Sequence, residues 1–394
     1  MVALNQRQMS APTRRGVEAR RKFRTAVHML QAQRRLGRPR HEAAERAAAE
    51  TQVSDHERTN RLVVMTLNLQ YFSSYPDDGE AAREALKQAT CVDDRPAAAD
   101  IIAVQEGVAD VDVLGAVGYD LVACSGKAGE AQTVREMVYN DGAALRACPS
   151  KLHDSVLCNQ LYLRRGSAWK VEESGVERIS SDLELKGGGD RCEGPLATRS
   201  MVWARLRRPG SEGSVYVMCT HISGGRFEDQ YFVQQLADER RRQPERCVDF
   251  FERRRQAPED TAILVGDFNA LEEYAADGPM HCYFGFGVAP SGGVRADAEA
   301  AGLRSPEELE AQFKEYMVSP FAALRGAGWS FAYGKEIGVT SCFGHLVDHM
   351  ATSRPVEVDR CDVKYLTNQK VGNKPRDTEL PLTDHNAVKV AFFL

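Results

Sequence analysis

Short apolar runs recur along the chain, and several of them end at a polar or acidic residue. Runs with the length and composition of buried strands lie at Leu62–Leu67, Asp100–Val104, Met201–Leu206, Ser214–Thr220, Thr261–Val265, Leu346–Ala351 and Ala387–Phe393. Asp120–Ala123 and Ser155–Leu163 show weaker strand patterns. The polar turn Arg208–Gly213 predicts that the two strands it joins are neighbours.

Three further segments have the pattern of helices. Ala81–Thr90 and Ser305–Met317 are short, and the second has a serine cap followed by Pro306 at its first helical position. The long segment Asp229–Arg255 has Arg and Glu on its outer side and four candidates for burial, Phe232, Leu236, Val248 and Phe251. Many short strands with interspersed helices predict a mixed α/β domain, for which two packed sheets flanked by helices would be suitable.

Oxygen-bearing side chains at the ends of these runs are candidates for catalysis. Asp267 and Asn269 follow a strand two residues apart, so both point to one side if the strand continues, and together they could orient a water and hold a phosphate oxygen. The alternative is an Asx-type turn that caps the strand. Glu106 ends another run, where its carboxylate would suit a hard cation such as Mg²⁺ or simply face solvent.

Two histidines also lie at strand ends. His221 precedes a Gly-Gly turn, and both it and Arg226 could donate to a phosphate oxygen, although a lone histidine is often structural. His385 precedes the last strand and is a candidate general base or proton donor. Its neighbour Asp384 is a candidate carboxylate for a metal or a water.

Asp348 and His349 lie next to each other within an apolar run, so strand alternation places them on opposite faces. At most one of them can face the site unless the strand bulges. We favour Asp348, because a carboxylate that accepts a ring N–H from His385 would fix the tautomer of that histidine.

Charge is distributed unevenly along the chain. Residues 1–50 contain 12 Lys/Arg and 4 Asp/Glu, whereas the remainder contains 39 and 52, so a basic arm precedes an acidic body. We interpret residues 1–58 as a disordered or loosely helical arm, with an organellar transit peptide or a polybasic arm for nucleic acid or membrane as alternatives. Residues 59–394 form the predicted domain, with a specificity insert around 277–330.

Composition and motifs argue against a membrane-spanning or secreted protein, a zinc-thiolate protein and a serine hydrolase. No apolar run approaches the roughly 18 residues of a membrane span, and the N-terminus lacks the apolar core of a secretory signal. The ten cysteines include no Cys-x-x-Cys pair, which argues against a thiolate zinc site and favours reduced thiols over disulfides. No Gly-x-Ser-x-Gly motif indicates a serine nucleophile.

In their order along the chain, these residues resemble the endonuclease/exonuclease/phosphatase superfamily, which has the deoxyribonuclease I-like fold. The resemblance covers roughly residues 60–394 and rests on Asn68, Gln105-Glu106, His221, Gly266–Asn269, Asp348 and Thr383-Asp384-His385. It implies a four-layer sandwich of two mixed β-sheets flanked by helices, with the active site at the sheet ends.

The resemblance also implies roles for individual residues. Glu106 would bind Mg²⁺ with help from Asn68, while Asp267 and Asn269 would orient water and phosphate. His385, held by Asp348, would act as base or phosphate ligand, and Asp384 would support the metal or the water. Asn159 resembles a substrate-binding asparagine of several members, although Cys158 stands where they have glycine.

The predicted function is Mg²⁺-dependent hydrolysis of phosphate esters, with Mn²⁺ as a substitute, by a phosphodiesterase or nuclease that acts on DNA or RNA. A phospholipid or inositol-phosphate hydrolase of the same superfamily is one alternative, and a catalytically silent binding scaffold is another. We expect an intracellular monomer whose basic arm could direct it to an organelle or the nucleus.

Overall fold

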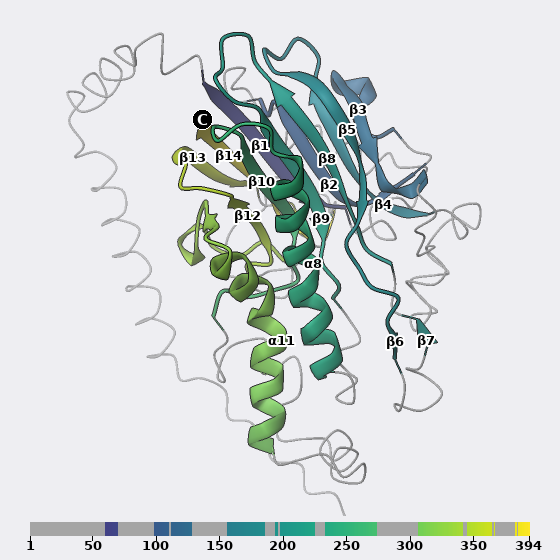
Figure 1. Cartoon of the computed structure of the whole chain (residues 1–394). Helices are drawn as coiled ribbons and strands as arrows, with labels where there is room; N and C mark the ends of the chain where they lie inside the picture. The colour runs from purple at the N-terminus through teal and green to yellow at the C-terminus, as the bar shows by residue number, and fades with distance from the viewer. Residues whose placement is uncertain are drawn as a thin grey trace, which may run out of the picture. The chain divides into compact units, whose positions relative to one another are not determined.

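The computed structural model describes residues 60–69, 98–109, 112–127, 156–185, 194–195, 198–224, 233–273, 306–341, 345–364, 366, 383 and 385–394. This part of the chain contains two six-stranded sheets and two long helices (Figure 1). Several predicted features lie outside the described residues: the basic arm, the helix Ala81–Thr90, Arg226, the buried candidate Phe232, residues 277–305 of the specificity insert, and Asp384.

The first sheet has the strand order β13-β14-β1-β2-β4-β3. Its strands are β1 (Arg61–Asn68), β2 (Ile101–Val108), β3 (Tyr119–Cys124), β4 (Leu157–Arg164), β13 (Glu357–Lys364) and β14 (Ala387–Phe393). β1 and β2 are parallel, and the other neighbours are antiparallel, so the sheet is mixed.

The second sheet has the order β11-β12-β10-β9-β8-β5. Its strands are β5 (Lys170–Arg178), β8 (Ser200–Arg207), β9 (Val215–His221), β10 (Thr261–Asp267), β11 (Ser330–Phe331) and β12 (Asp348–Thr352). Again one central pair, β9 and β10, is parallel between antiparallel neighbours. Two short strands, β6 (Glu184–Leu185) and β7 (Gly194–Pro195), pair separately.

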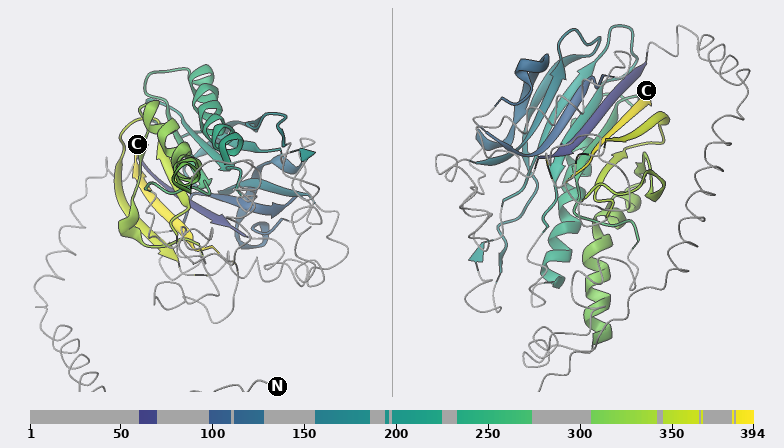
Figure 2. Two further views of the ribbon diagram at one scale, coloured as in Figure 1. Left: turned by 90° about the horizontal axis from the view of Figure 1, so that it is seen from below. Right: turned by 180° about the vertical axis from the view of Figure 1, so that it is seen from behind.

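The two sheets pack face to face, and the helices cover the outer face of the second. Val64 and Val390 of the first sheet share an apolar cluster with Val217 and Ile263 of the second. Helices α8 (Val233–Arg254) and α11 (Pro306–Gly326) lie on one side of the strands (Figure 2), where their apolar residues join those of β8, β9 and β10. The predicted pair of packed mixed sheets is therefore confirmed.

All of the predicted strands are present. The structure differs from the prediction in two additional strands at the sheet edges and in the end of one helix. β5 and β13 were not predicted, because an edge strand needs only one apolar face and both carry many charged residues. Helix α11 continues past the predicted end at Met317 and past Pro320, because Phe321 and Leu324 pack into the core beside the second sheet.

No helix in the described ranges is long and apolar enough to cross a membrane. Five cysteines lie in these ranges, and each is a free thiol: Cys124, Cys158, Cys219, Cys247 and Cys361.

Candidate active site

Seven of the predicted residues meet at one end of the two sheets, where the central parallel strands finish. β1, β9 and β10 end at this edge. β2 reaches it at Gln105 and continues a few residues further, to Val108. β12 runs antiparallel to β10 and begins here, and His385 stands just ahead of β14, which is antiparallel to β1. The seven residues are Asn68, Glu106, His221, Asp267, Asn269, Asp348 and His385.

Strand alternation explains the direction of four of these side chains. Asn68, His221, Asp267 and Asp348 each stand an even number of residues from a member of the inter-sheet core on the same strand. All four therefore face the space between the sheets, as the sequence predicted for Asp348. His349 faces the other way and packs against Phe268 and Phe321.

Glu106 joins the cluster because β2 is irregular at this point. The pairing of β2 with β4 shifts register between Val104 and Gly107, and Glu106 has a φ of 52°. In a regular strand, the side chain of Glu106 would point to the opposite face of the sheet from that of Gln105. A β-bulge can turn a side chain to the other face, and here it turns Glu106 toward the cluster. The side-chain Nδ2 of Asn68 donates to Glu106 Oε1 over 3.1 Å.

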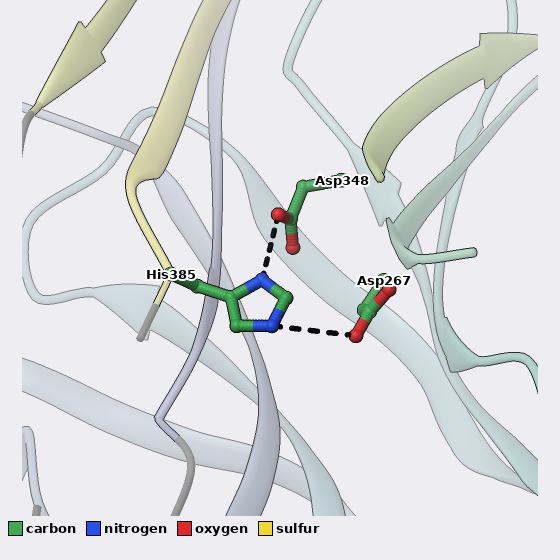
Figure 3. Close-up of side chains that lie close together, drawn as sticks. All are labelled: Asp267, Asp348 and His385. Carbon is green, nitrogen blue, oxygen red and sulfur yellow. Dashed lines mark hydrogen bonds and ion pairs between the residues drawn. The ribbon is translucent and has the colours of Figure 1, made fainter. Parts of the chain in front are cut away.

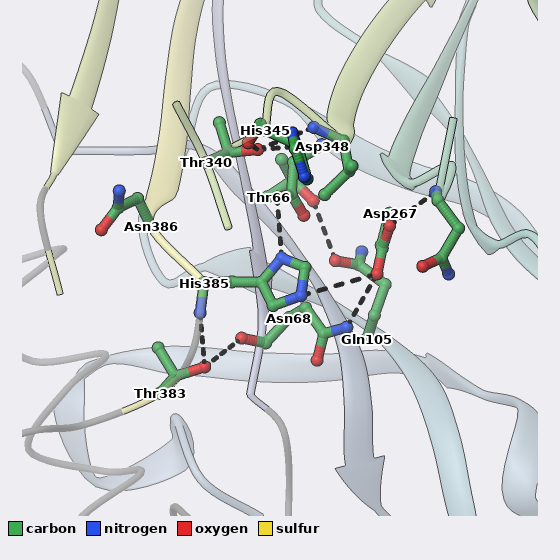
Figure 4. Close-up of polar contacts among 12 residues, drawn as sticks. Thr66, Asn68, Gln105, Asp267, Thr340, His345, Asp348, Thr383, His385 and Asn386 are labelled. Atoms are coloured by element: carbon green, nitrogen blue, oxygen red, sulfur yellow. Dashed lines mark hydrogen bonds and ion pairs between the residues drawn. The ribbon is translucent and has the colours of Figure 1, made fainter. Parts of the chain in front are cut away.

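Asp267 is the centre of the cluster. Asn68 Nδ2 also donates to Asp267 Oδ2 over 3.0 Å (Figure 4). The backbone N–H of Asn269 donates to Asp267 Oδ1 over 2.7 Å. The second bond is the Asx-type turn that was the alternative interpretation of this motif. The turn does not exclude the catalytic role, which stays a prediction, because one carboxylate oxygen closes the turn while the other faces the site.

His385 and Asp348 form a hydrogen-bonded dyad. His385 Nδ1 lies 2.8 Å from Asp348 Oδ2, and its Nε2 lies 3.7 Å from Asp267 Oδ2 (Figure 3). Thr340 Oγ1 accepts the N–H of Asp348, and Thr383 Oγ1 accepts the N–H of His385. These bonds fix the backbone on both sides of the dyad, so Nε2 remains directed at the cluster.

His221 closes the cluster on the side of the second sheet. Its Nε2 lies 3.5 Å from Asp267 Oδ2, 3.9 Å from Glu106 Oε1 and 3.0 Å from the amide nitrogen of Asn269. Its Nδ1 lies 3.4 Å from Nη1 of Arg199. Sequence analysis missed Arg199, because it stands just before β8 in a polar segment with no apolar run leading to it.

The surroundings set the charge of these groups. Burial, followed by the charge of Arg199, lowers the pKa of His221 to about 3, so this ring is neutral at neutral pH. Burial alone would raise the pKa of Asp267, but the charge of His385 and the hydrogen bonds from Asn269 and Asn68 outweigh it and hold that pKa below its usual value. Burial raises the pKa of Asp348, which shares a hydrogen bond with His385.

Two overlapping groups of side chains could bind a metal ion. Ligand atoms of Asp267, Asp348 and His385 lie within 4.8 Å of one another, but the bond between the histidine and Asp348 occupies one atom of each. A hard divalent cation prefers oxygen, which the carboxylates of Glu106 and Asp267 offer on either side of the Asn68 amide nitrogen. The oxygen set fits Mg²⁺ or Mn²⁺ better, and the dyad is better suited to holding a proton.

Three further candidates lie outside this cluster or outside the described residues. The side-chain nitrogen of Asn159 donates to the carbonyl of Ser200 over 2.8 Å, beside Arg199, so Asn159 joins β4 to the start of β8. Its role as a substrate ligand stays a prediction. Arg226 and Asp384 lie outside the described residues, and their predicted roles are untested.

The sequence matches no protein-family model and no curated protein. The structure is similar to an endonuclease/exonuclease/phosphatase from Bacteroides vulgatus (13% identity, 85% of this chain and 99% of that chain, TM-score 0.47). It is also similar to a mannosyl-6-phosphatase from Bacteroides thetaiotaomicron (14%, 84% and 100%, 0.46) and to the human Nocturnin catalytic domain (13%, 84% and 94%, 0.47). Similarity this distant identifies neither a substrate nor a reaction for this chain.

Proposed function

We propose that this protein is a divalent-metal-dependent hydrolase of phosphate esters that acts as a phosphodiesterase on DNA or RNA. The proposal rests on how the buried carboxylates lie relative to the histidine. Two buried carboxylates, Glu106 and Asp267, share the amide of Asn68 and lie beside the dyad of His385 and Asp348. Phosphoryl transfer needs such a combination of cation ligands and positioned proton donors and acceptors.

The residues present fit a cation of the Mg²⁺ type. Glu106 and Asp267 are at most 9% exposed, and two carboxylates brought together with so little solvent favour a nearby positive charge. Glu106 would hold the ion with Asn68 beside it, and the bound ion would supply positive charge to the phosphate oxygens.

The remaining polar groups would act on the water, the phosphate and the protons. Asp267 is held ionised by its neighbours, so its carboxylate can accept a hydrogen bond from the attacking water and draw off the proton. His385, oriented through Nδ1 by Asp348, presents Nε2 to the same space and can donate to a phosphate oxygen. His221, neutral and fixed between Arg199 and Asn269, can hold another phosphate oxygen.

Charge along the chain supports nucleic acid as the substrate. Residues 1–50 have 12 Lys/Arg against 4 Asp/Glu and could supply the backbone phosphate contacts that the acidic body lacks. A phospholipid or an inositol phosphate would use the same catalytic groups, so these substrates are alternative outcomes of the test.

The test is hydrolysis of single-stranded DNA, RNA, sphingomyelin, an inositol phosphate and an aryl phosphodiester, each with Mg²⁺, with Mn²⁺ and with chelator. We expect turnover of a nucleic acid that requires the metal and falls by about 10²–10⁴-fold in His385→Ala, the range for losing a general acid or base. His349→Gln is the matched control, since that histidine is buried on the opposite face of β12.

Two results would count against the proposal in different ways. Activity that persists both with chelator and in His385→Ala would show that the cluster is not the active site. A lipid or inositol phosphate as the best substrate would replace the nucleic-acid part and leave the metal-dependent mechanism in place.

A further inference from the structure

Helix α8 carries a buried row of polar side chains that the proposed chemistry does not use. Glu239, Arg240 and Gln243 are fully buried, although the same helix packs Cys247 and Phe250 into the apolar core. Burying a cation and two other polar side chains is unfavourable unless each is hydrogen-bonded. The hydrogen-bond partners of these side chains therefore indicate which segments of the structure they hold together.

Arg240 donates to three backbone carbonyls from three separate segments. Its Nε donates to the carbonyl of Tyr316 over 2.9 Å, its Nη2 to that of Asn269 over 2.7 Å, and its Nη1 to that of Ser223. The guanidinium carbon also lies 4.1 Å from the centre of the Tyr316 ring. All three of these hydrogen bonds end on backbone carbonyl oxygens, and the Tyr316 side chain is a further hydrogen-bond partner of the guanidinium.

Two of these carbonyls belong to the turns that carry site residues. Ser223 stands two residues after His221, and Asn269 stands two residues after Asp267. Gln243 strengthens the first attachment, because its Oε1 accepts the N–H of Ser223 and its Nε2 donates to the Ser223 hydroxyl.

The same two turns touch each other at the site. A Cβ added at Gly224 would lie 2.4 Å from the side-chain carbon of Asn269, so the turns are in close contact. The side-chain nitrogen of Asn269 also donates to the carbonyl of Ile222 over 3.1 Å. A small shift of either turn would therefore move His221 relative to Asp267.

We infer that Arg240 is a positioning residue that clamps the turns after β9 and β10 and so fixes His221 and Asn269 against Asp267. The catalytic consequence rests on the proposed function, whereas the clamp itself does not. A planar guanidinium has five donors in a fixed fork and can serve three carbonyls at once, which a lysine ammonium on a flexible chain does less well.

The test compares Arg240→Met, Arg240→Lys and Phe250→Leu. Phe250→Leu is the matched control, because it disturbs the same helix at a side chain that packs on Trp203 of β8 and removes none of the hydrogen bonds to the two turns. The first measurement is hydrogen exchange at two turn amides, the N–H of Ile222, which donates to Asp267 O, and that of Asn269, which donates to Asp267 Oδ1. The second is kcat and KM on the best substrate.

We expect Arg240→Met to speed exchange of both amides by about tenfold or more relative to the core strands, with Arg240→Lys between it and wild type. With an active substrate, kcat should fall by about 10²-fold while KM changes little, because misplacement of the reacting groups affects the chemical step. Phe250→Leu should leave the relative exchange of the turns and kcat unchanged.

Exchange in the Arg240 variants that matches Phe250→Leu would overturn the inference. If Arg240→Met does not fold, the comparison of Arg240→Lys with Phe250→Leu decides it. A wild-type protein that hydrolyses nothing would count against the proposed function alone, because the exchange result decides the clamp without any substrate.

Discussion

For single residues, the chemistry of the site depends on which partner each buried group has. Asp267 is 1% exposed, and its pKa is nevertheless lowered because it lies near the charge of His385 and accepts hydrogen bonds from Asn269 and Asn68. Asp348 is fully buried beside one histidine, and there burial dominates and raises the pKa. Two aspartates of the same cluster thus suit two roles, one as an ionised acceptor and one as a partner that orients His385.

Replacing Asp348 with asparagine tests that orienting role. Asp348→Asn preserves shape but removes the charge opposite Nδ1 of His385, so we expect kcat to fall by about 10²–10³-fold with KM little changed. Steady-state kinetics at saturating Mg²⁺ measures both. Asp359→Asn, at an exposed aspartate on β13, is the control. An unchanged kcat in Asp348→Asn would remove the dyad from the mechanism.

The sequence allowed residues to be placed in the site where strand alternation is regular. It selected Asp348 over His349, since neighbours on a strand face opposite ways. It could not show that Glu106 is redirected by a bulge in β2, because the shift depends on how β4 pairs with it. It also missed Arg199, whose place beside His221 arises only from the packing of β8 against β9.

Between elements, strands β9 and β10 approach each other very closely at Gly266, which directly precedes the site residue Asp267. Gly266 has a φ of 146°, and an added Cβ would lie 1.9 Å from the carbonyl oxygen of Thr220. Both the backbone conformation and the space therefore require glycine. The close approach places Asp267 directly beside His221 in the parallel pair.

Gly266→Ala should separate these strands. We expect it to lower the free energy of unfolding by about 3 kcal/mol or more, as a backbone clash in a fully buried strand does. Gly210→Ala is the control, because that glycine has a φ of 85° with open space around it and should lose only about 1 kcal/mol. Urea denaturation measures both, and equal losses would show that the strand contact is not tight.

The elements that sequence patterns predict best are those buried on both faces. β1, β9 and β10 are nearly continuous apolar runs, since each lies in the centre of a sheet covered on both sides. β5 contains five charged residues among nine and lies at a sheet edge, where exposure removes the pattern. The extent of α11 depends on the packing of Phe321, which no local pattern reveals.

For the molecule as a whole, three buried histidines couple folding to pH. Burial lowers the pKa of His349 to about 4 and that of His345 to about 4, and burial with Arg199 lowers that of His221 to about 3. An unfolded chain would protonate these rings below about pH 6.5, whereas the folded protein keeps them neutral. The unfolded state therefore binds more protons between pH 6.5 and 4, and stability falls as the pH is lowered through this window.

His349→Gln should weaken that dependence. Its ring nitrogen lies 3.1 Å from the carbonyl of Ala270, a bond that a glutamine amide can imitate without titrating. We expect the variant to lose on the order of 3 kcal/mol less than wild type between pH 7 and pH 4. Urea denaturation at several pH values measures the difference, and parallel curves for the two proteins would contradict it.

The decisive measurement is the rate of hydrolysis of single-stranded DNA as Mg²⁺ is titrated into metal-free protein, for wild type and Glu106→Gln. We predict no turnover without metal, a saturable rise in wild type, and a rise in the variant that needs far more Mg²⁺ or reaches a much lower rate, because the variant lacks the carboxylate proposed to hold the ion. Hydrolysis that is equally fast without metal, or identical Mg²⁺ curves for the two proteins, would contradict the proposed metal-dependent site.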